Sequence, residues 1–168
     1  SGEILNSILT DCFTDVNIYD DNIRLLQHQF ISPISSKNAI SFYRFFIQDT
    51  VFVDEDRCIE VTFTPNNPQD FGFSGSVFIM ADSTYRVRKS RLLIPHSSDV
   101  NFVEQLNVDQ KFVSLPTGDQ VLAQNKMTVQ ISAIMDMARL QVQLTNDYSD
   151  FSTAPLPDKE FRFGGQEY

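Results

Sequence analysis

The 168-residue chain contains 22 acidic and 13 basic residues, which gives a formal net charge of −9 and a pI near 4.5. Nucleic-acid-binding proteins need a basic face, so this balance argues against that class. Hydrophobic residues make up 42% of the chain and include fifteen Phe, enough for a packed core, so disorder is not expected. No apolar run approaches the ~18 residues that a transmembrane helix needs.

The N-terminal part predicts two short helices. The segment 3–13 has apolar residues at helical spacing, namely Ile4, Leu5, Ile8 and Leu9. A second helical turn is expected after Pro33, with Ser35 or Ser36 as its N-cap and an end near Ile40.

From residue 57 onward, alternation of apolar and polar residues predicts strands. It occurs in 57–64, 73–81, 127–135 and 138–144, although Phe78 and Met80 interrupt the polar face of 73–81. Such segments place one face on a core and the other in water. One contiguous core is therefore expected from Ile59, Val61, Phe63, Val77, Ile79, Val129, Ile131, Leu140 and Val142.

Short turns at 54–56, 81–84 and 116–119 join these strands, so sequential neighbours should pair in a meander. The longer link 65–70 is expected to form a rim loop. The segment 155–168 contains two Pro and two Gly and is interpreted as an exit linker, after a single antiparallel β domain over 1–154.

The predicted fold is mainly β: a curved antiparallel sheet, shaped as a half-barrel of roughly seven to nine strands, with one or two short helices over its concave side. A flat two-layer β-sandwich is the alternative.

Catalytic and metal-binding patterns are weak in this sequence. His96 precedes Ser97, Ser98 and Asp99, but a catalytic triad needs convergent side chains from separated positions. Two His and two Cys offer few zinc ligands, and the acidic clusters 20–22 and 54–56 lack the EF-hand spacing of a calcium loop. No enzymatic activity, cofactor or metal is therefore expected. Cys12 and Cys58 are interpreted as two independent buried thiols rather than a disulfide.

Two segments are candidate binding regions. The first contains Arg86, Arg88, Lys89 and Arg91, with the first two expected on one strand face and the last two on the other. Such a strip suits phosphate-bearing lipid headgroups or an acidic partner. Pairing with acids on the next strand, such as Glu60 or Asp109, is the favoured alternative.

The second candidate is the segment 68–75, which is rich in aromatic residues and glycine. In the functional interpretation, Phe71 and Phe73 belong to a binding loop. The favoured alternative is that both plug the core while Gly75 lets two strands approach closely.

Several segments in order resemble a known family: 17–23, 30–34, 42–45, 49–50, 63–65, 67–75, 101–104 and 148–151. The order is similar to the middle region of uncharacterised envelope proteins of Gram-negative bacteria, over roughly residues 15–152. Those proteins begin with a carboxypeptidase-regulatory-like β-sandwich and end in a predicted outer-membrane barrel. The resemblance implies an extracytoplasmic, periplasmic or outer-membrane-associated location and provides no catalytic residues.

At the level of fold, the pattern from Asp49 to Ile79 is similar to periplasmic lipoprotein carriers. The expected function is a non-catalytic structural or interaction module, whose partners are other domains of its own chain, an envelope protein or a lipid. The alternative is a carrier of an acyl chain or another apolar ligand in the concave face.

Overall fold

A computed structural model describes residues 2–94, 103–131, 138–148 and 160–167. Its main feature is an eight-stranded antiparallel sheet in which every strand pairs with its neighbours in the chain, in the order β10-β9-β8-β7-β6-β5-β4-β3. The strands are β3 (Tyr43–Val53), β4 (Asp56–Pro65), β5 (Ser74–Met80), β6 (Val87–Ile94), β7 (Val103–Ser114), β8 (Gln120–Ile131), β9 (Ala138–Asp147) and β10 (Glu160–Glu167). The prediction of a mainly β, open antiparallel meander is confirmed.

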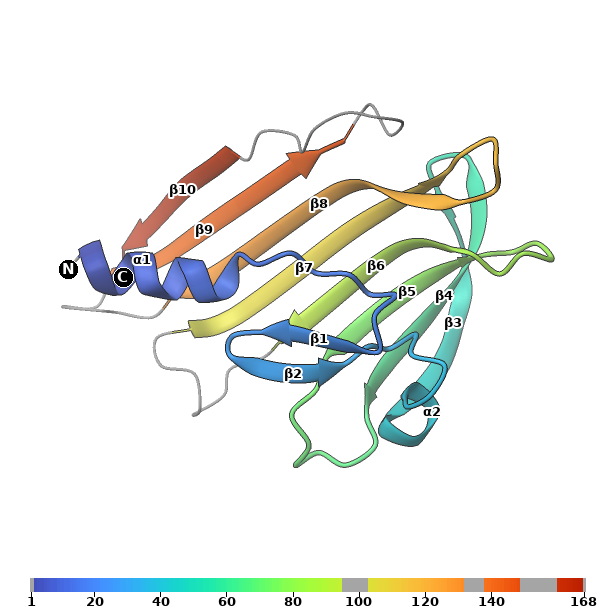
Figure 1. Ribbon diagram of the computed structural model, residues 1–168, viewed down its shortest axis with the longest axis horizontal. Coiled ribbons are helices and arrows are strands. Elements are labelled where there is room, and N and C mark those ends of the chain that lie inside the picture. Colours follow the sequence, from blue (N-terminus) through green and yellow to red (C-terminus); the bar gives the residue numbers. More distant parts are fainter. Residues whose placement is uncertain (1, 95–102, 132–137, 149–159, 168) are drawn as a thin grey trace.

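Four N-terminal elements lie over one face of this sheet, here called the covered face (Figure 1). They are α1 (Gly2–Cys12), the hairpin formed by β1 (Asn22–Leu25) and β2 (His28–Ile31), and α2 (Ala39–Phe42). The opposite face is called the open face. Within the described residues, no helix combines the length and apolar character needed to cross a membrane.

The main core lies between the covered face and the N-terminal elements. Of the nine residues expected in it, Phe63, Val77, Val129, Ile131 and Val142 are buried. Three more, Val61, Ile79 and Leu140, are half-buried and pack against this core, and Ile59 is half-buried. The N-terminal elements add Cys12, Ile18, Leu25 and Phe30, so the covered face is filled by the chain's own side chains.

A second, smaller cluster lies on the open face of β3, β4 and β5. It contains Val53, Cys58 and Phe78, with Val51 and Met80 packed against it. Phe78 faces Glu60 and Met80 faces Cys58 across the β4–β5 pair. This cluster explains why Phe78 and Met80 break the polar alternation of 73–81. Cys12 and Cys58 are both free and buried, in separate clusters.

Three local differences from the sequence-based expectations have physical reasons. The second helix, α2, begins at Ala39 rather than at Ser35 or Ser36, but Ser35 Oγ accepts a hydrogen bond from the Asn38 N–H and so caps the preceding turn. The β1–β2 hairpin turns at Leu26 and Gln27, both at positive φ, without the Gly or Asn that usually marks such a turn. Residues 160–167, expected within the exit linker, form β10 against β9.

The phenol of Tyr43 connects three parts of the core. Its hydroxyl donates to the Ile31 carbonyl at 2.6 Å and accepts from the Phe73 N–H at 3.2 Å. Burial raises the pKa of Tyr43 to about 12. A tyrosine in an unfolded chain ionises near pH 10. The stability from this buried phenol is therefore fully present below pH 10 and is lost as the pH rises from 10 through 12.

We expect the free energy of unfolding to fall by about 2–3 kcal/mol over this interval through Tyr43 alone. Tyr43→Phe removes the titrating group, so its unfolding free energy should fall less steeply. Urea titrations at several pH values above 9, in a Cys12→Ala background, measure the difference. That background is needed because burial and the charge of Asp11 raise the Cys12 pKa to about 12 as well. Parallel pH profiles for the two chains would contradict this assignment.

Candidate interaction surfaces

The outer edge of β3 and the adjacent α2 form the most apolar exposed surface among the described residues. Ile40, Ile47 and Phe52 are 83%, 79% and 70% exposed, and Phe46 is 50% exposed. The other large hydrophobic side chains found exposed in the described part are Tyr19 and Tyr85, each on a separate loop. We call the surface of Ile40, Phe46, Ile47 and Phe52 the apolar edge.

Cross-strand register places the apolar edge on both faces of the sheet. Ile47 lies opposite Val61 and shares its covered-face side, whereas Phe46 lies opposite Thr62 on the open-face side. A register shift between Ile47 and Asp49 divides β3 into two regular stretches. Because β3 ends the described sheet, its outward N–H and C=O groups face no strand of that sheet.

The rim loop extends to residue 73 in the structure, where it joins β4 to β5. It contacts this region, but its two aromatic residues point inward. Phe73 is fully buried and stacks on Phe30 with ring centroids 4.7 Å apart. Phe71 is half-buried, 4.9 Å from the same ring. The expected core role of Phe71 and Phe73 therefore matches their positions. The loop meets α2 through Asn66, whose N–H and amide donate to the Phe42 and Ser41 carbonyls.

Of the four basic residues considered as a binding strip, Arg88 is fully engaged within the protein. Its guanidinium donates to Asp56 at 2.9 Å, to Asp54 at 2.8 Å and to the Phe112 carbonyl at 2.7 Å. Arg86 precedes β6 and donates to Ser114 Oγ at 3.1 Å. The expected separation of Arg88 from Lys89 onto opposite faces is wrong, because a register shift opposite Phe78 and Ile79 inserts an extra residue there.

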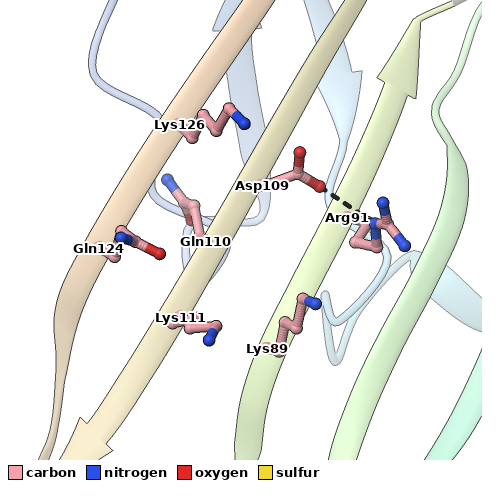
Figure 2. Close-up of a pocket in the computed structure, with 7 residues that line it drawn as sticks. All are labelled: Lys89, Arg91, Asp109, Gln110, Lys111, Gln124 and Lys126. Atoms are coloured by element: carbon pink, nitrogen blue, oxygen red, sulfur yellow. Dashed lines mark hydrogen bonds and ion pairs between the residues drawn. The ribbon is translucent and has the colours of Figure 1, made fainter. Parts of the chain in front are cut away.

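Lys89 and Arg91 share one face of β6, as expected, and this is the open face (Figure 2). Arg91 pairs with Asp109 at 3.2 Å, which confirms one of the acids named from the sequence. The other, Glu60, accepts instead from Ser76 Oγ at 3.3 Å. Lys111 lies directly opposite Lys89 on β7, and Lys126 lies opposite Asp109 on β8.

A row of polar residues crosses the covered face, among the apolar side chains of the main core. Gln110 faces Ser90 on one side and Asn125 on the other, and Asn125 faces Asn146. All four are buried. The Gln110 amide donates to Asn125 Oδ1 and to the Val16 carbonyl, both at 3.0 Å. This row therefore fixes the segment that follows α1 onto the centre of the sheet.

Comparison with family models matches residues 5–151 to a family of unknown function, DUF5686. The comparisons with curated proteins and with solved structures give no significant match. The matched region includes the whole sheet except β10, together with the hairpin, α2 and nearly all of α1. The chain therefore belongs to the DUF5686 family, whose function is unknown.

Proposed function

We propose that this chain is a non-catalytic interaction module of a larger bacterial envelope protein, and that it docks through the apolar edge. The observation that supports this proposal is the position of Ile40, Phe46, Ile47 and Phe52 on and beside an edge strand. Exposed apolar residues at an unpaired sheet edge are typical of sites that receive another chain segment.

The occupant that this edge suits is an extended segment with apolar residues on both sides. Only a strand offers the backbone donors and acceptors that an edge strand needs, as in β-strand addition. Natural sheets protect exposed edges with Lys, Pro or inward-pointing charges. β3 contains no Pro and no Lys, and its charged residues are Arg44 and Asp49 alone. Support for the envelope location comes from the resemblance of the ordered sequence segments, which implies a position between other domains of the same protein.

Packing of the interior favours the interaction module over a carrier of an acyl chain. A carrier needs an open apolar site, commonly ~300–1,000 Å³ in volume. In the described part of the chain, Ile18, Leu25 and Phe30 occupy the space over the covered face and are almost completely buried. A co-purifying acyl chain at near-stoichiometric occupancy, detected by native mass spectrometry, would favour the carrier instead.

Ile47→Lys tests the proposed docking, with Ile47→Val as its matched control. Ile47 is exposed on the covered-face side of β3, and Val keeps an apolar, β-branched side chain there. Neither substitution should change the unfolding free energy of the 168-residue chain by more than about 0.5 kcal/mol. Ile47→Lys places a charge within the docked apolar contact, so it should make β3 more susceptible to limited proteolysis in the intact envelope protein. Equal susceptibility of the two variants would contradict docking at this edge.

A further inference from the structure

The open face of β6, β7 and β8 contains a shallow depression of about 150 Å³. Its lining is predominantly cationic and comes from three adjacent strands (Figure 2). The open-face lining residues are Lys89, Arg91, Asp109, Lys111, Gln124 and Lys126, and Gln110, whose side chain belongs to the covered-face polar row, also borders the depression.

The charge of this depression is opposite to that of the chain. Four cations and a single carboxylate give the lining a formal charge of +3, on a protein whose formal net charge is −9. Asp109 already forms an ion pair with Arg91 at 3.2 Å. The Lys111 ammonium lies 3.7 Å from the Asp54 carboxylate, which also pairs with Arg88. Among the described residues, neither Lys89 nor Lys126 has a carboxylate within ion-pair distance.

The arrangement of the cations is unfavourable without a counter-charge. Lys89 and Lys111 are directly opposite each other on neighbouring strands, where like charges destabilise a sheet. The Lys89 ammonium lies 5.3 Å from the centre of the Phe78 ring and is half-buried. Burial, followed by repulsion from Arg91 and Lys111, lowers the pKa of Lys89. An anion placed between the two lysines would remove this repulsion.

We propose that this depression binds a phosphate group, with Lys89 and Lys111 as its principal contacts and with Arg91 and Lys126 at its sides. The volume corresponds to about five water molecules at their liquid share of roughly 30 Å³ each, which is enough for one phosphate group. Lysine ammonium groups bind phosphate as point charges, and the guanidinium of Arg91 still has Nη donors beyond the Nε that bonds to Asp109. The group belongs either to a phospholipid headgroup or to a soluble phosphate compound.

This proposal is independent of docking at the apolar edge. The depression lies on the central strands of the sheet, whereas β3 lies at its border. Substitutions in one surface therefore test it without altering the other.

The double variant Lys89→Gln/Lys111→Gln tests the site in the 168-residue chain. Arg24→Gln/Arg57→Gln is the matched control, because it removes the same charge from two exposed residues outside the lining. Thermal unfolding is measured in sodium phosphate and in sodium chloride of equal ionic strength. Sedimentation then measures binding to equimolar phosphatidylglycerol–phosphatidylcholine vesicles and to pure phosphatidylcholine vesicles.

The wild-type chain and the control should be stabilised by phosphate or should bind the anionic vesicles. The lysine double variant should bind the same probe at least about tenfold more weakly. In chloride the double variant should be at least as stable as the wild type, because it has lost a like-charge pair. Stabilisation by inorganic phosphate indicates a soluble compound, and binding to anionic vesicles alone indicates a headgroup. Polyglutamate is added in a parallel thermal unfolding series as a probe for an acidic peptide. Equal responses of the double variant and the wild type, no response to phosphate or to anionic vesicles, or stabilisation by polyglutamate without a response to phosphate would each overturn the proposal.

Discussion

Replacing Gly75 with Ala should lower the free energy of unfolding by about 3 kcal/mol or more. Gly75 has φ of +147°, a conformation that L-residues rarely adopt. A Cβ at this position would also overlap the backbone carbonyl oxygen of Arg91 on β6. Because the obstacle is backbone in a paired strand, it has no rotamer through which to move away. The substitution therefore forces β5 and β6 apart where they pair.

Gly118→Ala separates the two causes of this loss. Gly118 also has positive φ, at +93°, but an added Cβ would meet only the end of the flexible Arg86 side chain, at 3.4 Å. Its substitution should cost about 1 kcal/mol, from backbone strain alone. Urea unfolding of the two variants measures the difference. Equal losses would show that the close approach of β5 to β6 contributes nothing.

Replacing Phe73 with Ala should lower the free energy of unfolding by about 3–5 kcal/mol. The ring is completely buried and stacks on Phe30. The substitution leaves a cavity where the rim loop enters β5, beneath the β1–β2 hairpin. If Phe73 were a surface binding residue, the same substitution would lower the free energy of unfolding only slightly.

Phe46→Ala is the control for this prediction, because it removes the same side chain from the apolar edge. Phe46 is half-exposed, so the loss should stay below about 1 kcal/mol. Chemical denaturation of both variants decides between a core role and a surface role for Phe73. A loss under about 1 kcal/mol for Phe73→Ala would place it outside the core.

Much of the sheet was predictable because alternation reports which face of a strand is buried. Phe63, Val77 and Val129 follow this period and lie in the main core. The β1–β2 hairpin was not predicted, because each strand has only four residues and its turn uses Leu26 and Gln27. The strand β10 was missed because two glycines within it resemble a linker.

The surfaces were less predictable than the strands. Arg88 appears in the sequence as one of a row of available cations, but it is itself the extra residue of the β6 register shift, and its guanidinium bonds to Asp54 and Asp56. Lys111 and Lys126 join Lys89 only through the register of β6, β7 and β8, which alternation does not specify. The apolar edge depends on β3 being the last strand of an open sheet, and no local pattern reports this.

Amide hydrogen exchange of β3 tests the docking of the apolar edge most directly. It is measured in the 168-residue chain and in the larger protein that we propose contains it, with β6, β7 and β8 as internal references. We predict that β3 amides exchange rapidly in the 168-residue chain and become strongly protected in the intact protein, because a docked strand satisfies the outward backbone groups. The central strands should exchange at the same rates in both. Unchanged exchange in β3 would contradict the proposal that this edge receives a strand.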